Sequence, residues 1–382
     1  MEKKPQSAMS TNNDTAQTVC NHTEMTAPPS RPQRLLSLDV MRGLDMFFLV
    51  VIGPILTTWQ RIRGLPAWLN TQLHHVDWEG LTAWDLIMPW FIFMCGAAIP
   101  FALSKRLKNG RAGWTYWSHV LGRVSLLWLL GMIVQGNLLS LNPSMISPYN
   151  NTLQTIAAGY LIAALLLLIR NRTIRYLIPL LLAAAYGMTL AFFGDYTPQG
   201  NIAVRIEQWL LPMNRDGYSW VLTTPMFGVM TLCGMFCTEV LRNKCSAARK
   251  IFSLLLLGIG LLFGGMLLGC WEPAIKRIYT VSFTFQALGW GVLMLTVLYF
   301  VIDVCRIKRG WGLLSLYGRR ALTAYLCGTL FWHPLNVLAQ TLTYGMTYWI
   351  GAKSYPLVQV SFATLLLTLL LYFRDRLNRK HP

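Results

Sequence analysis

Long apolar runs alternate with short polar segments along most of the chain. The runs cover residues 41–59, 84–103, 119–138, 153–169, 174–193, 220–241, 251–270, 280–302, 315–338 and 356–373. A helix needs about 20 apolar residues to cross the hydrocarbon core of a bilayer, and most of the runs approach that length. Strand-like alternation of apolar and polar positions is absent. The pattern therefore predicts an all-α polytopic membrane protein with about ten transmembrane helices.

The two ends of the chain differ from this core. Residues 1–33 are rich in Ser, Thr, Asn and Pro and lack the apolar segment of a signal peptide, so we expect a disordered polar tail. Residues 34–374 form the predicted transmembrane core, where short connections and the lack of a repeat favour one bundle. Residues 375–382 form a short basic tail.

The distribution of cations predicts the orientation. Hydrophobic residues make up 54% of the chain, yet the net charge is +18. Of the 33 Lys and Arg residues, 26 fall on the side of the N-terminus when the ten runs alternate across the membrane. Positive residues accumulate in cytoplasmic loops, so both termini are predicted to be cytoplasmic. The cations form no single patch, which argues against nucleic acid as a partner.

Charged residues enter the first predicted span at a regular spacing. Asp39, Arg42 and Asp45 are three residues apart, so on a helix they share one face and Arg42 can pair with either acid. The alternative is an ordinary helix entrance, in which Asp39 caps backbone amides and Arg42 extends toward the interface. Asp45 lies one turn deeper, where an ionisable side chain is costly and more often functional.

The segment 74–85, on the predicted outer side, gathers two imidazoles, three carboxylates and two indoles. An imidazole at a hydrated helix end can accept a proton or carry an acyl group, and a carboxylate such as Asp85 would fix its tautomer. The alternative is structural, since Thr82 and Asp85 have the spacing of a capping box. Either His74 or His75 is therefore a candidate for chemistry.

Other polar residues lie near predicted helix ends. Gln154, Arg277 and His333 are near outer ends, and His333 is placed to share a cavity with His75. Arg123 and Arg320 are near cytoplasmic ends, where they can bind an anionic ligand or contact lipid phosphates. The Cys and His spacings contain no metal-binding pattern, so we expect no metal.

Two stretches form longer motifs. They are Arg34-x-x-Ser37-x-Asp39-x-x-Arg42-Gly43 and His75-x-x-Trp78-x-Gly80-x-Thr82-x-x-Asp85-x-x-x-Pro89-Trp90-Phe91. Weaker signals follow at Leu153-Gln154, at 276–282 and at Gly318-Arg319-Arg320-Ala321. Together they resemble the heparan-α-glucosaminide N-acetyltransferase-like family of transmembrane acyltransferases, which has bacterial members. The resemblance implies an enzyme that transfers an acetyl group from cytoplasmic acetyl-CoA to a glucosamine-like amine across the membrane, with His75 as the catalytic residue.

The predicted site follows from this resemblance and from the polar residues. We predict that His75 is catalytic, aided by Asp85 or Asp45, and either carries the acetyl group or acts as a base. The donor phosphates are assigned to Arg42, Arg123 and Arg320. The acceptor is assigned to Trp78, Asp39, Gln154, Arg277 and His333.

Two other functions stay open at this stage. One is a transporter or flippase of a small polar solute, which would use the buried charges as a pathway. The other is a catalytically inactive scaffold. Membrane lipid is an expected partner and a homodimer is possible. If the source is bacterial, the membrane is the cytoplasmic (inner) one. The acceptor, the acyl chain length and the oligomeric state are not determined by the sequence.

Overall fold

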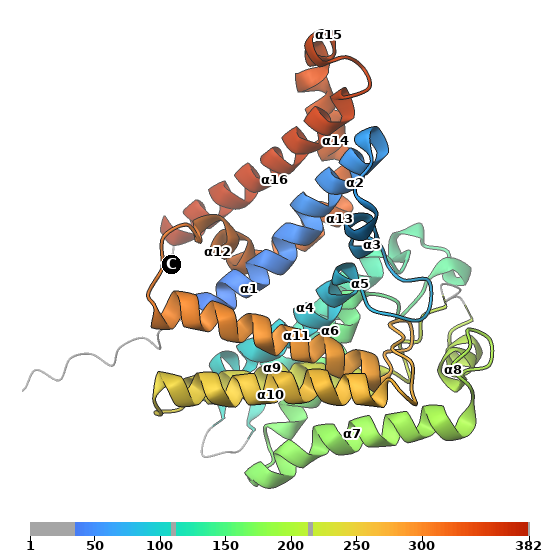
Figure 1. Cartoon of the computed structure of the whole chain (residues 1–382), viewed down its shortest axis with the longest axis vertical. Coiled ribbons are helices and arrows are strands. Elements are labelled where there is room, and N and C mark those ends of the chain that lie inside the picture. Colours follow the sequence, from blue (N-terminus) through green and yellow to red (C-terminus); the bar gives the residue numbers. More distant parts are fainter. Residues whose placement is uncertain (1–34, 108–111, 213–216, 381–382) are drawn as a thin grey trace, which may run out of the picture. The chain divides into compact units, whose positions relative to one another are not determined.

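The computed structural model describes residues 35–107, 112–212 and 217–380 (Figure 1). The tail predicted at residues 1–33 lies outside these ranges. The described part is helical, and its only strand-like pairing is one antiparallel bridge between Glu79 and Ile275. The predicted all-α class is therefore confirmed.

The long α-helices coincide with the apolar runs, and short helices also occur between the runs. The α-helices are α1 (Leu36–Phe47), α2 (Gly53–Arg63), α3 (Ala67–Gln72), α4 (Ala83–Ala102), α5 (Trp114–Val134), α6 (Thr152–Leu166), α7 (Arg172–Phe193), α8 (Ile202–Leu210), α9 (Thr224–Arg242), α10 (Ala247–Leu268), α11 (Val281–Leu298), α12 (Gly312–Arg319), α13 (Ala321–Leu330), α14 (Trp332–Thr343), α15 (Thr347–Ile350) and α16 (Tyr355–Lys380). A π-helical turn, Phe48–Ile52, joins α1 to α2, and another, Tyr299–Val304, extends α11. Short 3-10 turns occur at Ser104–Arg106, Leu138–Ser140, Pro143–Met145 and Tyr344–Met346.

Eight helical segments of the described chain are long and apolar enough to cross a membrane. They are Leu36–Arg63, Ala83–Arg106, Trp114–Val134, Arg172–Phe193, Thr224–Arg242, Ala247–Leu268, Val281–Val304 and Tyr355–Asn378. Two shorter apolar helices, Thr152–Leu166 and Ala321–Leu330, coincide with two further predicted runs. The protein is thus a multi-pass helical membrane protein. The number of ten spans and the side of the termini stay predictions.

The predicted run 315–338 is not one continuous helix. It is divided at Arg320 and Phe331 into α12, α13 and α14. Pro334 explains the second break, because proline has no amide hydrogen to donate to the carbonyl of residue 330 and its ring clashes there. Pro334 is instead accommodated in the first turn of α14, where no such bond is needed.

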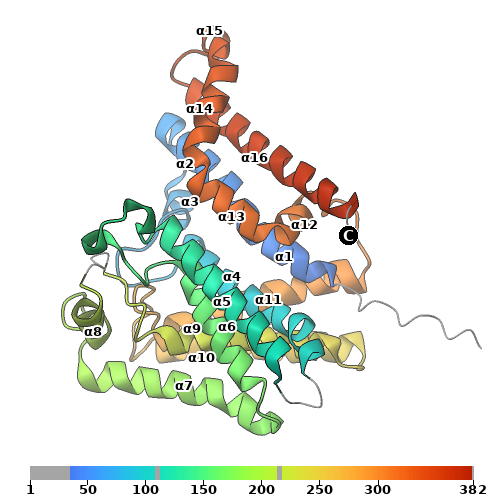
Figure 2. The same ribbon diagram turned by 180° about the vertical axis from the view of Figure 1, so that it is seen from behind.

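The helices form two groups that contact each other mainly through α1, which packs on α4 and α11, and also where α13 meets α5. The first contains α1, α2, α12, α13, α14 and α16, and the second contains α4 to α11 (Figures 1 and 2). Within the first group α1 and α12 approach closely at Gly43 and Gly318. A Cβ atom at Gly43 would lie 1.7 Å from the carbonyl oxygen of Leu314, so only glycine permits this crossing.

Loops that the topology prediction assigned to the outer side meet at one end of the structure. Trp78 Nε1 donates to the carbonyl of Tyr196, and Gly80 N donates to the carbonyl of Ala274. The amide of Ser219 donates to the carbonyl of Arg277. Segments about 200 residues apart in sequence are therefore tied together at this end, and the candidate site lies among them.

Candidate functional site

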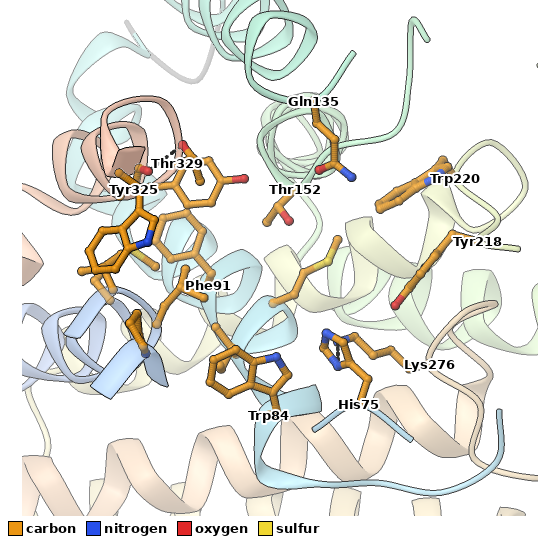
Figure 3. A pocket seen from close by; sticks show the side chains of 18 residues that line it. His75, Trp84, Phe91, Gln135, Thr152, Tyr218, Trp220, Lys276, Tyr325 and Thr329 are labelled. Carbon is orange, nitrogen blue, oxygen red and sulfur yellow. Dashed lines mark hydrogen bonds between the residues drawn. The ribbon is translucent and has the colours of Figure 1, made fainter. Parts of the chain in front are cut away.

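A cavity of about 430 Å³ lies between the two helix groups at this end. Figure 3 shows His75, Trp84 and Lys276 on one side of it and Tyr325 and Thr329 on another. The lining comes from six helices, the first π turn and four loops: Met46, Leu49, Val50, Pro54, His75, Trp84, Ile87, Met88, Phe91, Gln135, Thr152, Tyr218, Trp220, Lys276, Tyr325, Gly328, Thr329 and Trp332. Apolar walls with a few convergent polar groups are typical of small-molecule sites.

His75 is held by a buried carboxylate. Its Nδ1 lies 2.7 Å from Oδ1 of Asp85, which fits a hydrogen bond donated by the imidazole. The Asp85 side chain is 1% exposed and that of His75 is 47% exposed. With its proton on Nδ1, the imidazole keeps the lone pair of Nε2 free, so Nε2 can act as a base or a nucleophile.

The two oxygens of Asp85 have different functions. Oδ2 accepts from the backbone amide of Thr82 at 3.2 Å and from its hydroxyl at 2.8 Å, which completes the capping box at the start of α4. Oδ1 contacts His75. The capping box and the contact with the imidazole therefore occur on one carboxylate, while the catalytic roles of His75 and Asp85 stay predictions.

Lys276 is the third member of this cluster. Its Nζ lies 3.2 Å from Asp85 Oδ1 and 3.0 Å from His75 Nδ1, and the residue is 8% exposed. Burial lowers the pKa of Lys276, and the neighbouring Asp85 carboxylate opposes this effect. The turn that carries Lys276 ends at Tyr279, which adopts a left-handed backbone with φ of 45°. Such strain in a non-glycine residue is commonly found at functional sites.

Two aromatic residues form a platform on the cavity wall. Tyr218 and Trp220 stack with ring centroids 5.5 Å apart and an interplanar angle of 22°. Tyr149 packs behind Trp220, with ring centroids 6.2 Å apart. Trp220 is buried, and its Nε1 has no hydrogen-bond partner among the described residues. Figure 3 shows both side chains on the wall of the cavity that contains His75, so the platform gives this cavity an aromatic wall.

Three of the predicted acceptor residues do not line the cavity. Trp78 does not line the cavity, because its indole bonds to the carbonyl of Tyr196 at 2.6 Å. Arg277 stacks over the Tyr218 ring at 5.7 Å and so supports the platform from behind. Gln154 is fully buried, where it accepts from the amides of Asn150 and Asn151 as part of the capping box of α6.

The remaining acceptor candidates lie away from the cavity lining. His333 is exposed on α14, although its neighbour Trp332 does line the cavity. Asp39 lies on α1 where that helix crosses Gly318. Neither contributes to the lining. Their assignment to the acceptor stays a prediction.

Asp45 is buried in α1, one residue before Met46 of the cavity. Its Oδ2 has no hydrogen-bond partner among the described residues. No hydrogen bond joins it to His75, so within the described chain Asp85 is the carboxylate that contacts the imidazole. A catalytic role of Asp45 stays a prediction.

Two of the predicted donor-binding arginines converge on the middle of α4. Arg42 donates to the carbonyl of Met94 at 3.0 Å, and Arg123 lies 3.7 Å from the sulfur of Cys95 and over the Tyr160 ring. Neither forms an ion pair in the described chain, so Arg42 is not paired with Asp39 or Asp45. Two guanidinium groups without counter-ions fit an anionic ligand.

Arg320 differs from these two arginines. Its Nε donates to Oδ1 of Asp375 at 3.1 Å, and Arg319 donates to the other oxygen of the same carboxylate. The pair joins α12 and α13 to α16, which continues through Lys380. Neither Arg42, Arg123 nor Arg320 lines the cavity that contains His75. No group of three metal-ligating side chains occurs in the described ranges.

Sequence reasoning missed Lys276, Tyr218 and Trp220 as site residues. Lys276 and Arg277 are adjacent cations before the predicted run 280–302, and the structure brings Lys276 to His75 while Arg277 stacks over Tyr218. The only indication for Lys276 in the sequence is its position just before a predicted span. Cations often lie there because they anchor a helix at the membrane interface, so this position does not distinguish a site residue. Tyr218 and Trp220 carry no motif that distinguishes them from other interfacial aromatics.

Comparisons with known proteins agree with the motifs. Residues 34–168 match the family described as "Domain of unknown function (DUF5009)". Heparan-alpha-glucosaminide N-acetyltransferase of Homo sapiens is 29% identical over 103 residues, which are 27% of this chain and 14% of that protein. The Mus musculus protein of that name is 29% identical over 105 residues, 28% of this chain and 14% of its own length. The matched segments thus span about a seventh of these relatives.

The matched region contains the residues at the centre of the site. Residues 34–168 include His75 and Asp85, the two members of the hydrogen-bonded pair, together with Arg42 and Arg123. Lys276, Tyr218 and Trp220 lie beyond that region. Residues 34–168 therefore match the DUF5009 family model, and the chain resembles the heparan-α-glucosaminide N-acetyltransferase-like family, as its motifs predicted.

Proposed function

We propose that this protein is a membrane-embedded N-acetyltransferase that transfers an acetyl group from acetyl-CoA to the amine of an amino sugar. The observation that carries the proposal is the 2.7 Å contact between His75 Nδ1 and Asp85 Oδ1 at the wall of the cavity. A carboxylate that fixes the tautomer of an imidazole is a recurring arrangement for acyl transfer. The names of the similar proteins support the same reaction.

The chemistry needs a group that accepts the proton of the amine. In the first route, Nε2 of His75 attacks the thioester carbonyl, the C–S bond breaks, and the CoA thiolate leaves and takes a proton. The amine then attacks the acetyl-imidazole, releasing His75 and a proton. In the second route, the amine attacks the thioester directly while Nε2 accepts its proton. Both give an amide and CoA, and Asp85 stabilises the imidazolium that forms in either case.

The donor would extend past the two unpaired arginines at the middle of α4 toward the cavity. Cys95 follows Asp85 by ten residues on α4, which is about 15 Å along a helix. Arg42 and Arg123 would hold the anionic part of CoA at that depth, and the thioester would extend toward His75. Met46 and Phe91 of the cavity lie about one turn from Arg42 and Met94, respectively.

The acceptor would bind on the aromatic side of the cavity. The Tyr218–Trp220 platform gives a sugar ring a flat apolar face, and the Nε1–H of Trp220 can donate to a hydroxyl. Lys276 would keep Asp85 charged and in place beside the reacting imidazole. This assignment replaces Trp78 as the principal aromatic contact and keeps Arg277 as its support.

The remaining assignments are part of the same proposal. Arg320 is proposed to contribute to donor binding together with Arg319, next to their Asp375 partner. For a bacterial source the proposed location is the cytoplasmic membrane, with both termini inside the cell. The transporter alternative is not favoured, because the imidazole, carboxylate and amine cluster at one end of the structure and the similar proteins are transferases.

The decisive experiment uses purified protein, acetyl-CoA labelled in the acetyl group, and glucosamine as the acceptor. We expect labelled N-acetylglucosamine from the wild type and a loss of about 100-fold or more in His75→Ala, since an acid–base group contributes at least that much. His74→Ala is the matched control, because His74 is the neighbouring imidazole and its ring bonds to the backbone carbonyl of Asn70, away from Asp85.

Three outcomes would contradict the proposal. They are product formation that survives His75→Ala, an equal loss in His74→Ala, and uptake of the sugar into proteoliposomes without consumption of acetyl-CoA. Rapid acid quenching followed by mass spectrometry separates the two chemical routes. An acetyl group on residue 75 supports the first route.

A further inference from the structure

A second hollow lies on the lipid-facing side of the structure, away from the His75 cavity. It has a volume of about 540 Å³ and runs between α7 and α10 over the start of α11, which Figure 1 shows as the green, yellow and orange helices. The lining is almost entirely apolar or aromatic and includes Leu180, Ala184, Phe192, Tyr196 and Trp271. Glu272 is the exception. We refer to this hollow as the α7–α10 groove.

The groove has the dimensions and position of a lipid chain. Leu180 and Phe192 are twelve residues apart on α7, which is about 18 Å along a helix. Both are more than half exposed, and α7 and α10 are membrane-spanning helices that bury little of their surface. The exposed Trp271 and the half-buried Tyr196 lie at one end of the groove, in the loops where spans end. Aromatic residues of this kind mark the level of lipid head groups.

Glu272 places an acceptor at that same end. One carboxylate oxygen, Oε2, accepts from the amide of Ser282 at 3.1 Å and so caps the start of α11. The other oxygen, Oε1, is buried and has no hydrogen-bond partner among the described residues. Glu272 as a whole is 7% exposed. Capping the helix uses only one oxygen, which leaves the second without a function in the described fold.

A buried carboxylate oxygen in an apolar setting requires a donor. No cation forms an ion pair with Glu272 in the described chain, and burial raises the pKa of this carboxyl. A ligand that fills the groove with hydrocarbon and presents a positively charged N–H donor at its interfacial end would satisfy both features. Phospholipids with a primary ammonium head group have this chemistry, whereas choline lipids lack the N–H donor.

We propose that the α7–α10 groove binds an aminophospholipid, with an acyl chain along α7 and the ammonium of the head group donating to Oε1 of Glu272. The proposal does not depend on the acetyltransferase reaction. It assigns the groove a selective lipid, in contrast to the nonspecific contacts that any membrane-spanning helix makes.

The test is native mass spectrometry of the full-length protein in detergent, titrated with dioleoyl phosphatidylethanolamine, phosphatidylcholine or phosphatidylglycerol. We expect the wild type to prefer phosphatidylethanolamine over phosphatidylcholine by about tenfold, the scale of a charge-assisted hydrogen bond. Glu272→Gln keeps an acceptor for Ser282 but loses the charge, so this preference should fall close to unity.

A second pair of variants tests the groove independently of Glu272. Ala184 lines the groove and Ala185 does not, although both are exposed on α7. Ala184→Trp should fill the groove and abolish the selective binding, while Ala185→Trp should behave like the wild type. Equal binding of the ethanolamine and choline lipids by the wild type would overturn the proposal. So would a preference that survives Glu272→Gln, or equal effects of the two tryptophan variants.

Discussion

Oδ1 of Asp85 lies 2.7 Å from Nδ1 of His75, while Oδ2 of the same carboxylate closes the capping box with Thr82. The Asp85 side chain thus holds the imidazole of His75 by a hydrogen bond at the first turn of the membrane-spanning helix α4. Because the cap fixes the rotamer of Asp85, the position of His75 depends on the start of α4 more than on its own flexible segment.

Substitutions can separate the proposed positioning role of Asp85 from its observed capping role. Asp85→Asn should lower the rate of acetyl transfer by about 100-fold, because an amide no longer stabilises the imidazolium. Thr82→Val removes the hydroxyl bond to Oδ2 but keeps the bond from the Thr82 backbone amide to the same oxygen, so it should lower stability by about 1 kcal/mol while leaving the rate within a few-fold. Steady-state kinetics and detergent denaturation measure the two effects. Equal rates in both variants would show that Asp85 is only a cap.

The pH dependence of the reaction should report on Lys276. Burial lowers its pKa from the ordinary 10.5, so the folded protein releases this proton at a lower pH than the unfolded chain. Below the pKa that Lys276 has in the folded protein, burial of the charged amine lowers the stability by its full cost. This cost disappears as the pH rises from that pKa toward 10.5, so the contribution of Lys276 to stability increases between the two values. Activity should change in the opposite direction, because a neutral amine no longer pairs with Asp85.

We therefore expect an alkaline decline of kcat that begins below pH 10.5 in the wild type. Lys276→Arg keeps the charge at every accessible pH, so the decline should move to higher pH. Lys276→Met should reduce kcat by about tenfold or more at neutral pH, because it leaves Asp85 without its ion-pair partner. An arginine variant with an unchanged alkaline decline would remove Lys276 from the mechanism.

The acceptor platform predicts a selective effect on one substrate. Trp220→Phe keeps the stacked ring and removes the N–H donor, so the KM for the amino sugar should rise about tenfold with the KM for acetyl-CoA unchanged. Trp209→Phe is the control, because Trp209 is 80% exposed on α8 and does not line the cavity. A parallel change in both KM values would point to a structural role for Trp220.

The proposed role of Arg42 and Arg123 in donor binding predicts a selective effect on acetyl-CoA. Arg42→Met and Arg123→Met should each raise the KM for acetyl-CoA about tenfold, with a smaller effect at high salt, because each removes an unpaired cation. The KM for the sugar should stay the same. Arg63→Met, at the exposed end of α2, serves as the control. Unchanged donor affinity in both variants would locate the CoA site elsewhere.

The close crossing of α1 and α12 predicts a stability effect. Gly43→Ala would place a methyl group 1.7 Å from the carbonyl oxygen of Leu314, so the helices must separate at a cost of about 1–3 kcal/mol. Gly264→Ala is the matched control, since a Cβ atom there meets nothing within 4 Å and alanine favours the helix. Denaturation in a graded detergent series measures both. Equal stability of the two variants would contradict the close crossing.

The sequence alone was sufficient for the features that depend on neighbouring residues. Apolar runs long enough to cross a bilayer determine the spanning helices, because backbone groups in lipid must be satisfied within the helix. The spacing of Thr82 and Asp85 predicted their capping box, since a cap forms within one turn. The motif from His75 to Phe91 likewise indicated the site, because its key pair is only ten residues apart.

The tertiary structure alone decided which distant residues complete that site. Lys276 is 201 residues from His75, and Arg277 would have been an equally good choice from the sequence. The turn at Tyr279 and the packing of α11 bring one cation to the imidazole and leave the other behind Tyr218. From the sequence, Gln154 is a polar residue near a helix end that could contact the acceptor. The structure shows that its side-chain oxygen caps the start of α6. Contacts of this kind depend on the packing of the whole bundle, which no local pattern of apolar and polar residues encodes.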